Sequence, residues 1–505
     1  MESVMPQRGS WVYFVGIKGT GMCALAELMH NKGMRVSGSD TAEVFYTDSI
    51  LKSLGIPYHE SFDASHVFSV DGNDEKTPDL VVHSAAYSVE TNAELAKVSQ
   101  LGIPLYKYTD ALGAYSLDFD SSGITGVHGK TTTTALTGAL IKGALLPAQV
   151  LAGSAVSAFR SADTSGDRST LCLGGKYFVA ETCEYRRHFL SFHPRRIVLT
   201  SVESDHQDYY PTYESIRDAF VEYGTLLPSG GELIYCADDP GASEVARIVH
   251  KTKPDLRLTP YGFSAQGDFG ITHYEVKDER IILRLRFSPD DLSIRIPGRH
   301  TALNAAAAMA LTSSLVRKEF GSASNSGWND ARWNGALSAL QAFSGSRRRS
   351  EILGEAGGIL FMDDYAHHPT AIKTTLSGIK EFYPNRRLVV SFMSHTYTRT
   401  ASLLDEFAAS FDCADVLVLH KIYSSAREAY SGGVTGKTLF DNVKARYKNS
   451  DPGKLLYYAE EVADAVELVK PILKAGDLFI TMGAGDNWRL GSILYDYYST
   501  QGTKQ

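Results

Sequence analysis

A glycine-rich segment in the first third of the chain carries the residues best suited to chemistry. Its residues, in order, are Gly126, Val127, His128, Gly129, Lys130, Thr131 and Thr132. Glycines let backbone N–H groups converge on phosphate oxygens, a helix start adds positive charge, the lysine reaches the terminal phosphates, and the first threonine can bind magnesium. The spacing between the glycines is shorter than in the general phosphate loop. The segment nevertheless predicts an ATP or GTP site, and the alternative is a plain turn before a helix.

Two further metal-capable groups follow apolar runs. Residues 177–180 stop at Glu181, and residues 196–202 stop shortly before His206. Because ligands gather beyond the carboxyl ends of parallel strands, we expect Glu181 and His206 on the same sheet edge as the phosphate loop. A carboxylate and an imidazole beside a triphosphate suit magnesium completed by water and phosphate. The alternative for His206 is a hydrogen-bonded structural histidine.

A second glycine-rich loop lies near the N-terminus, between a predicted strand at 11–15 and a helix-like stretch. Its candidate ligand-binding residues are Gly16, Lys18, Gly19, Thr20, Gly21 and Met22. A second strand at 35–40 ends in Asp40, and a third apolar run, 80–84, ends in Ser84. The glycine order G-x-x-G-x-G differs from the dinucleotide fingerprint, which disfavours NAD or FAD and favours another nucleotide-like ligand. A structural tight turn is the alternative.

The last third of the chain repeats the pattern of apolar runs that end in polar groups. A predicted strand at 358–362 precedes Asp363, Asp364 and His367, and another at 388–392 precedes His395 and Arg399. The two acids and the two histidines, His368 included, suggest a metal site at the end of the first of these strands. The alternative is a loop without a metal, because consecutive histidines on an irregular loop point in different directions.

Two other polar groups stand out by their context. An alanine-rich helix is predicted from Thr301, and its first turn carries Asn304, whose amide binds either adenine or the helix end. Arg349 closes a run of three arginines, which is either a solvated face or a phosphate partner.

Composition limits the class of protein. The 505 residues include 43% apolar and 21% charged residues, and the net charge is −8, so we expect no nucleic-acid partner. The five cysteines form no Cys-x-x-Cys pair, which favours reduced thiols over disulfides or zinc. No apolar run approaches membrane-spanning length, and residues 1–10 lack a signal-peptide core. We therefore expect a cytoplasmic protein without membrane insertion.

Strand-like runs alternate with helical patterns along the whole chain, which predicts open α/β sheets. The length suggests about three domains. We place their boundaries at 1–117, 118–342 and 343–505.

Taken in order, these motifs resemble the Mur ligase family over nearly the whole chain. The matching segments are residues 126–132, 180–184, 205–206, 300–304, 348–349, 363–369 and 395–399. The opening loop at 16–22, the Asp-Asp-Tyr-x-His-His-Pro loop and the His-x-Tyr-x-Arg-Thr segment are most similar to the branch that adds L-alanine.

The resemblance implies a fold and an activity. It implies a Rossmann-like N-terminal domain for a UDP-sugar, a central P-loop ATPase-like domain with a mostly parallel sheet, and a Rossmann-like C-terminal domain. It implies an ATP- and Mg²⁺-dependent ligase of peptidoglycan precursor synthesis. That ligase joins L-alanine to the lactyl carboxylate of UDP-N-acetylmuramate through an acyl phosphate and releases ADP and phosphate.

The resemblance also implies roles for single residues. Residues 126–132 would hold the ATP phosphates, Asn304 the adenine, Asp364 the ribose, and Arg349 the phosphate or ribose region. Thr131 and Glu181 would hold one magnesium ion and His206 a second. The catalytic group would comprise Lys130, His206, His367, His395 and Arg399. The UDP-sugar would contact Gly16, Lys18, Gly19, Thr20, Gly21, Met22, Asp40 and Ser84.

Some positions depart from the family pattern. Val127 replaces a threonine, Lys18 a glycine, Thr396 an arginine and Ala371 a glutamate. Loss of the arginine weakens the prediction of the amino acid, because a guanidinium there pairs with a carboxylate. A tripeptide-recycling ligase and a non-catalytic ligand-binding protein on the same scaffold remain alternatives. The sequence predicts no oligomeric state.

Overall fold

The computed structural model describes residues 5–71, 74–160, 166–288, 290–321, 328–424, 428, 432–451 and 453–501. They form two compact units. The first unit comprises Met1–Val202, Arg217–Gly270 and Ala305–Leu340, and the second comprises Glu203–Ile216, Ile271–Asn304 and Gln341–Gln505. The division into three domains at 117/118 and 342/343 stays a prediction.

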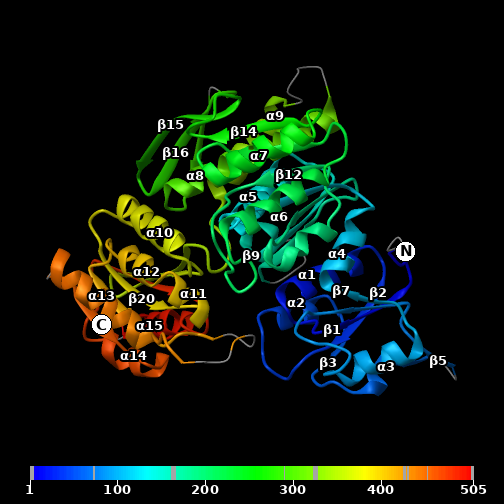
Figure 1. Ribbon diagram of the computed structural model, residues 1–505, viewed down its shortest axis with the longest axis horizontal. Coiled ribbons are helices and arrows are strands. Elements are labelled where there is room, and N and C mark those ends of the chain that lie inside the picture. The colour runs from blue at the N-terminus through cyan, green and yellow to red at the C-terminus, as the bar shows by residue number, and fades with distance from the viewer. Residues whose placement is uncertain are drawn as a thin grey trace. The chain divides into compact units, whose positions relative to one another are not determined.

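The N-terminal sheet belongs to the first unit and is parallel, in the order β3-β2-β1-β6-β7 (Figure 1). Its strands are β1 (Trp11–Val15), β2 (Arg35–Ser39), β3 (Tyr58–His59), β6 (Leu80–His83) and β7 (Leu105–Lys107). Its helices are α1 (Thr20–Asn31), α2 (Thr47–Ser53), η1 (Ala64–Val67), α3 (Ala93–Leu101) and α4 (Tyr108–Ser116). A separate hairpin joins β4 (Ser69–Asp71) and β5 (Asp74–Lys76). The strands predicted at 11–15, 35–40 and 80–84 are confirmed within one residue. The first and third are apolar runs between turn residues, whereas 35–40 is mostly polar.

The central sheet has the order β10-β9-β11-β8-β12-β13-β14-β15-β16-β17. Its strands are β8 (Asp120–Thr125), β9 (Ala148–Val156), β10 (Arg168–Cys172), β11 (Tyr177–Glu181), β12 (Arg196–Leu199), β13 (Glu232–Cys236), β14 (Arg257–Gly262), β15 (Phe269–Lys277), β16 (Arg280–Leu285) and β17 (Asp291–Ile294). The run from β9 to β15 is parallel, and β10, β16 and β17 add antiparallel edges. The mostly parallel sheet is confirmed.

The helices that accompany the central sheet are α5 (Lys130–Gly143), η2 (Ser157–Phe159), η3 (Tyr185–Ser191), α6 (Tyr213–Thr225), α7 (Pro240–Thr252), α8 (Arg299–Phe320) and α9 (Asp330–Ala342). Helix α8 begins at Arg299, two residues before the predicted start. Asn304 therefore lies in its second turn, and the prediction of the first turn is wrong. The reason is that Gly298 has φ of 102°, a backbone conformation that ends the extended segment before it, so the helix begins at the next residue, Arg299.

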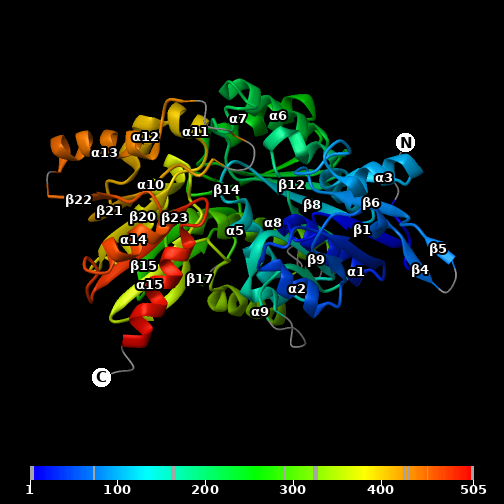
Figure 2. The ribbon, with the colours of Figure 1, turned by 90° about the horizontal axis from the view of Figure 1, so that it is seen from below.

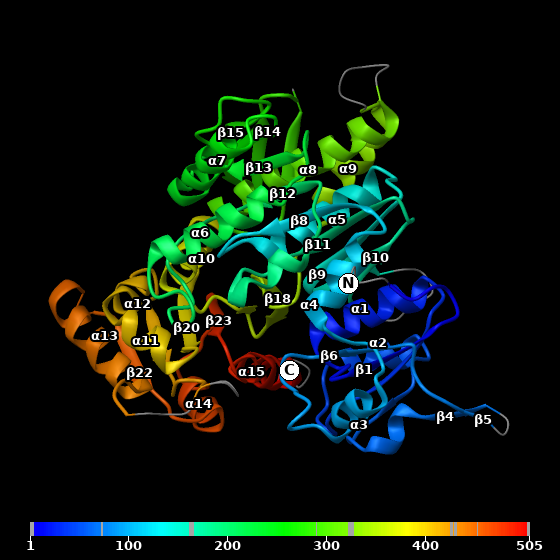
Figure 3. The ribbon, with the colours of Figure 1, turned by 45° about the vertical axis from the view of Figure 1, so that its right-hand side comes forward.

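Helix α1 packs against β9 and β10, so the N-terminal and central sheets are joined within the first unit (Figure 3). Arg168 on β10 forms a buried ion pair with Glu27 on α1. Beside it, the Tyr115 hydroxyl donates to Gln149 Oε1 at 2.6 Å. A buried charge pair tolerates little displacement, since separating it leaves a desolvated ion.

The C-terminal sheet belongs to the second unit and has the order β18-β19-β23-β20-β21-β22. Its strands are β18 (Glu351–Ala356), β19 (Ile359–Asp364), β20 (Arg387–Met393), β21 (Val416–Leu419), β22 (Leu455–Tyr458) and β23 (Asp477–Gly483). Its helices are α10 (Pro369–Phe382), α11 (Tyr397–Ser402), α12 (Leu404–Ser410), α13 (Gly436–Ser450), α14 (Val462–Val469) and α15 (Trp488–Gln501). All pairings except β18–β19 are parallel.

The strand predicted at 358–362 extends further than expected. β19 continues through Asp363 and Asp364, and both side chains are buried. Asp363 Oδ2 accepts from Arg348 Nε at 2.9 Å, and Asp363 Oδ1 accepts from the Thr481 hydroxyl at 2.7 Å. Because these partners satisfy the carboxylate inside the sheet, the strand does not end where the acids begin.

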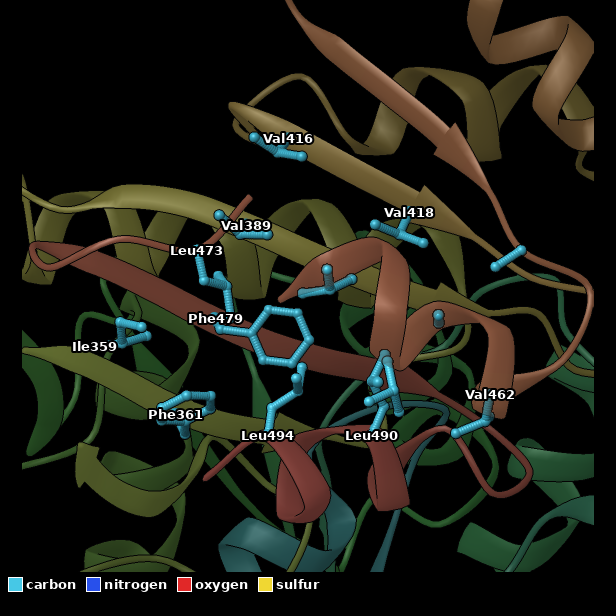
Figure 4. Packing of buried hydrophobic residues seen from close by; sticks show 14 of the residues in the cluster. Ile359, Phe361, Val389, Val416, Val418, Val462, Leu473, Phe479, Leu490 and Leu494 are labelled. Atoms are coloured by element: carbon cyan, nitrogen blue, oxygen red, sulfur yellow. The ribbon is translucent and has the colours of Figure 1, made fainter. Parts of the chain in front are cut away.

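Helix α15, drawn red near the C-terminus in Figure 2, packs against β18, β19 and β23. Phe479 on β23 lies at the centre of the apolar cluster between sheet and helices, beside Leu490 and Leu494 of α15 (Figure 4). Among the described residues, no helix is long and apolar enough to cross a membrane.

We expect Phe479→Ala to lower the free energy of unfolding by about 3–5 kcal/mol, because the ring is fully buried and its loss leaves a cavity. Urea denaturation measures the change. Ile493→Ala is the matched control on α15, since Ile493 is 45% exposed and its truncation is expected to change the free energy by less than about 0.5 kcal/mol. Equal effects of the two substitutions would contradict this account of the core.

Candidate functional site

The phosphate loop follows β8, which pairs in parallel with β11 on one side and β12 on the other. Gly126 has φ of 134°, and a Cβ there would lie 2.1 Å from Thr200 Oγ1. Gly129, with φ of 82°, is the N-cap of α5. Both positions therefore require glycine, and the backbone N–H groups of the first turn of α5 begin directly after the loop.

The residues that follow β12 brace the loop. The N–H of Val127 donates to the Ser201 carbonyl at 3.0 Å, and the N–H of His128 donates to Ser201 Oγ at 2.9 Å. The Thr200 hydroxyl donates to the Thr125 carbonyl at 3.0 Å. The strand was predicted to end at residue 202. It ends at Leu199, because the residues that follow bond to the phosphate loop. Sequence reasoning missed Thr200 and Ser201, because it placed both inside the predicted strand and their bonding partners lie many residues away.

Lys130 opens α5, and its side chain turns back over the loop. Its Nζ donates to the Val127 carbonyl at 3.2 Å and lies 2.9 Å from Glu184 Oε2. Burial alone lowers the pKa of Lys130, but the negative charges of Glu184 and Glu181 outweigh it and place that pKa above its ordinary value. Lys130 is therefore a cation that is held at the loop before any phosphate arrives. Glu184 was not predicted as a site residue.

Thr131 and Glu181 meet, as the prediction of a shared metal requires. The Thr131 hydroxyl donates to Glu181 Oε1 at 3.2 Å, and the N–H of Gly153 donates to Glu181 Oε2 at 2.9 Å. A cavity of about 160 Å³ lies beside them in the first unit. Its lining includes Gly21, Tyr108, Gly153, Glu181, Cys183 and His188. The cavity thus joins the opening loop of the chain to the group beside the phosphate loop.

The opening loop lies at the carboxyl edge of the N-terminal sheet. Gly16 has φ of 86°, and a Cβ there would lie 3.0 Å from the Ser84 Cβ, so these two candidates are neighbours. The N–H of Lys18 donates to Asp40 Oδ2 at 2.7 Å. Gly19 caps α1, which then carries the remaining candidates Thr20, Gly21 and Met22. The structure therefore gathers all of the candidates for the nucleotide-like ligand, although the Lys18 side chain is buried.

In the second unit, Arg399 is the centre of a charged cluster. Its Nη2 and Nε lie 2.7 and 3.0 Å from Asp205 Oδ1, and its Nη1 donates to His395 Nδ1 at 3.1 Å. Arg399 and Asp205 are 4% and 5% exposed, so this is a buried ion pair. Burial alone raises the pKa of Asp205, but the charge of Arg399 outweighs it and holds that pKa well below its usual range. Sequence reasoning did not assign Asp205.

Two histidines complete this cluster. The His367 ring lies edge-on to His395, with ring centres 5.4 Å apart, and its Nδ1 lies 2.7 Å from the Tyr365 carbonyl. Burial, followed by the positive charge of Arg399, places the pKa of His367 well below its ordinary value, so the imidazole is neutral. His206 has φ of 54°, and its N–H donates to Asp205 Oδ1 at 2.7 Å. The structure thus brings together His206, His367, His395 and Arg399.

Thr396 lies between His395 and the start of α11. It has φ of 66°, which is rare for a β-branched residue. Its N–H donates to the Tyr423 carbonyl at 2.9 Å, and its own carbonyl accepts from the Thr400 hydroxyl at 2.7 Å. These bonds hold a strained residue beside the cluster, which is where such strain is commonly found.

Asp364 is held by backbone groups. Its Oδ2 accepts from the N–H of Ser350 at 2.7 Å, and its Oδ1 accepts from the N–H of Ala366 at 2.7 Å. Burial raises the pKa of Asp364, and the nearby charge of Arg349 opposes that shift. Asn304, also in the second unit, is 6% exposed. The predicted magnesium ligands are divided between the units, since Thr131 and Glu181 belong to the first and His206 to the second.

Comparisons with known proteins agree with this geometry. Three family models match in order: the Mur ligase family catalytic domain at residues 12–120, the Mur ligase middle domain at 124–312, and the Mur ligase glutamate ligase domain at 348–485. The UDP-N-acetylmuramate–L-alanine ligase of Treponema pallidum (strain Nichols) is 50% identical over 493 residues, which cover 98% of each chain. The chain belongs to the Mur ligase family.

Other Mur ligases are similar at lower identity. The UDP-N-acetylmuramate–L-alanine ligase of Borreliella burgdorferi is 36% identical over 487 residues, covering 96% of this chain and 98% of that one. The structure of the UDP-N-acetylmuramate–alanine ligase of Thermotoga maritima matches with a TM-score of 0.74 at 24% identity, covering 97% and 100% of the two chains. A murein peptide ligase from Psychrobacter arcticus matches with a TM-score of 0.61 at 22% identity, covering 96% and 97%. At these identities the two structures establish the fold alone.

We expect Asp205→Ala to destabilise this Mur ligase by about 3–5 kcal/mol, because it leaves the buried Arg399 guanidinium without its carboxylate. Urea denaturation at neutral pH measures the loss. Asp412→Ala is the matched control, because the Asp412–Arg446 pair, at 2.6 Å, is 52% and 38% exposed and contributes about 0–1 kcal/mol. A loss no larger for Asp205 than for Asp412 would show that the guanidinium does not depend on this partner.

Proposed function

We propose that the protein is an ATP-dependent ligase that joins L-alanine to UDP-N-acetylmuramate in peptidoglycan precursor synthesis. The observation that carries the proposal is the full-length identity of 50% to a relative named for this reaction. The geometry supports it, since a phosphate loop, a metal-capable group and a cationic cluster all have the side chains that such a reaction needs.

The reaction has two chemical steps. A lactyl carboxylate oxygen attacks the γ-phosphorus of ATP, the bond to the β,γ-bridging oxygen breaks, and ADP leaves. The amine of L-alanine then attacks the acyl carbon, phosphate leaves, and the nitrogen loses its proton as the amide forms. Both steps need charge neutralisation and alignment more than covalent participation of the protein.

The phosphates of ATP are proposed to lie on residues 126–132. The loop and the start of α5 supply N–H donors, and Lys130 supplies the positive charge. Glu184, whose Oε2 lies 2.9 Å from Lys130 Nζ, favours the charged form of Lys130 and holds its side chain over the loop. For the rest of the nucleotide we propose Asn304 as the adenine contact, Asp364 as the ribose contact, and Arg349 near the phosphate or ribose.

Magnesium is proposed beside Thr131 and Glu181. A hydroxyl and a carboxylate 3.2 Å apart are the oxygen donors that this ion prefers, and the carboxylate retains lone pairs beyond its two present bonds. His206 is proposed to hold a second ion. When bound, magnesium neutralises charge on the transferring phosphoryl group.

The UDP-sugar is proposed to lie along residues 16 and 18–22, with Asp40 and Ser84 at the same edge. The cavity of about 160 Å³ supports this placement. Its lining includes Gly21 of the opening loop and Glu181 of the metal-capable group, so it lies between the two.

For L-alanine we propose the cluster of His367, His395 and Arg399. Arg399 is the cation suited to a carboxylate, and the neutral His367 adds no charge that would repel the attacking amine's ammonium precursor. Thr396 supplies no second guanidinium. We propose that His367, His395 and Arg399 surround the reacting amino acid or the γ-phosphate.

The proposed domains keep the boundaries 1–117, 118–342 and 343–505. The UDP-sugar belongs to the first, ATP to the second, and the amino acid and further nucleotide contacts to the third. The boundary at 117 is supported by the sheet topology, because the described strands before it form sheets of their own, which share no strand with the central sheet.

Phosphate release from ATP tests the function directly. The reaction contains magnesium and UDP-N-acetylmuramate, with L-alanine, L-serine, glycine or the L-alanyl-γ-D-glutamyl-diamino acid tripeptide added separately. We expect release that depends on both the sugar nucleotide and L-alanine. Release only with the tripeptide would replace the proposal by a recycling ligase, and silence with every acceptor would favour a binding protein.

We expect Lys130→Met to lower kcat by at least about a hundredfold, because it removes the charge that stabilises the transferring phosphoryl group. Steady-state phosphate release measures the effect. Lys142→Met is the matched control on the same helix, since Lys142 is exposed and donates to the carbonyls of Ala158 and Arg160 at 3.0 and 3.1 Å. A Lys130 variant as active as the Lys142 variant would exclude this role.

A further inference from the structure

Lys18 carries a charge that is fully buried. Its side chain is 0% exposed, and its Nζ lies 3.1 Å from Asp48 Oδ1 and 3.4 Å from Glu60 Oε1. The same Nζ donates to the carbonyls of Thr41 at 3.0 Å and Glu43 at 3.1 Å. An ammonium leaves water at a high cost unless it is paired and hydrogen-bonded, and this one has acceptors for all of its protons. We call these four acceptors, the carboxylates of Asp48 and Glu60 and the carbonyls of Thr41 and Glu43, the cage. All hydrogen-bonding groups of the Lys18 side chain are therefore used within the protein.

The backbone groups of Lys18 are also used within the protein. Its N–H donates to Asp40 Oδ2 at 2.7 Å, and its carbonyl accepts from the Thr47 hydroxyl at 2.6 Å. Asp48, one carboxylate of the cage, also accepts from the Tyr58 hydroxyl at 2.6 Å and from the N–H of Phe45 at 2.7 Å. One residue of the opening loop thereby joins the end of β2, the start of α2 and β3.

The segment between β2 and α2 depends on these bonds. Residues 41–46 form no helix or strand, and two of their carbonyls are held by the Lys18 ammonium. The segment is exposed to solvent, and even its apolar side chains Val44 and Phe45 are 84% and 38% exposed. A segment with so little buried apolar surface depends on hydrogen bonds for its conformation. Beside the bonds to the Lys18 ammonium, the N–H of Thr41 donates to Asp40 Oδ1 at 2.8 Å, the N–H of Phe45 to Asp48 Oδ2 at 2.7 Å, and the Tyr46 hydroxyl to Thr20 Oγ1 at 3.2 Å.

We propose that Lys18 is a positioning residue for the sugar nucleotide, and that its buried ammonium holds residues 41–48 in the conformation that receives the substrate. In this role Lys18 lies along the substrate edge without a hydrogen bond to the substrate, because its ammonium and its backbone N–H and carbonyl already have protein partners. The inference rests on the proposed function, since it requires the UDP-sugar to lie along the edge formed by the opening loop and Asp40.

The consequence for binding is one of preorganisation. Without the ammonium, the segment is ordered only when the substrate arrives, so the substrate must offset the entropy of ordering it. The cost falls on the sugar nucleotide alone. ATP and the amino acid are proposed to bind elsewhere and do not meet this segment.

Three variants separate this role from general stability. Lys18→Met keeps the apolar stem and removes the ammonium. Asp48→Asn removes the opposing carboxylate charge and leaves Lys18 intact, so it carries the test if Lys18→Met does not fold. Lys52→Met is the matched control, because Lys52 lies on α2 beside the cage but is exposed.

Two measurements are made on the full-length protein. Calorimetry gives the Kd for UDP-N-acetylmuramate and for ATP, and hydrogen exchange followed by mass spectrometry reports on residues 41–48. For Lys18→Met we expect the Kd for the sugar nucleotide to rise roughly tenfold, the Kd for ATP to change less than about twofold, and exchange in residues 41–48 to accelerate. Asp48→Asn should shift both readouts in the same direction, and Lys52→Met should match the parent.

The outcomes distinguish this inference from the proposed function. Parent protein that does not bind UDP-N-acetylmuramate would overturn the proposed function and the inference with it. Parent protein that binds it, while Lys18→Met binds it equally well, would overturn the inference alone. Equal losses of affinity for ATP and for the sugar nucleotide would also overturn it, because they would indicate a general structural defect.

Discussion

The parallel pairing of β11, β8 and β12 is the constraint on which the first unit depends. It aligns Glu181 with Ile124 and Leu199 with Thr125, so three strands end at one level of the sheet. The chemical groups at the central sheet follow from that level: the loop after β8, the carboxylate at the end of β11, and the hydrogen bonds from the residues after β12. Hydrogen bonds between parallel strands are set in register, so a slip of one strand would separate the groups that must meet.

Buried and half-buried ion pairs fix the positions of chemical groups where helices and strands end. Lys130 with Glu184, Arg399 with Asp205, and Lys18 with Asp48 each place one ion on a loop or at a helix start and its partner on another segment. Such pairs add little net stability compared with apolar packing, but breaking one is costly, so they fix positions. The loops are therefore held by charge, while the sheets are held by packing.

The strands and helices were predictable, because apolar runs such as 11–15, 177–180 and 388–392 stand between turn residues. The phosphate loop was predictable for the same reason, since its residues are adjacent in the chain. Asp205, Glu184, Thr200 and Ser201 were not assigned, because their roles depend on partners many residues away. The ends of β12 and β19 were misplaced by a few residues, where side-chain bonds to distant segments decide whether the strand continues.

The division of the chain has a consequence for engineering. Each unit is assembled from three separate segments, and the chain passes between the units inside β15 and inside α8. No single cut can release either unit whole. A fragment that stopped at Val202 would keep the phosphate loop and the residues after β12 that bond to it, but it would lose β13 and β14. Strand β12 would then be an unpaired edge strand, which promotes aggregation. Dissection of this protein therefore has to proceed by substitution within the full chain.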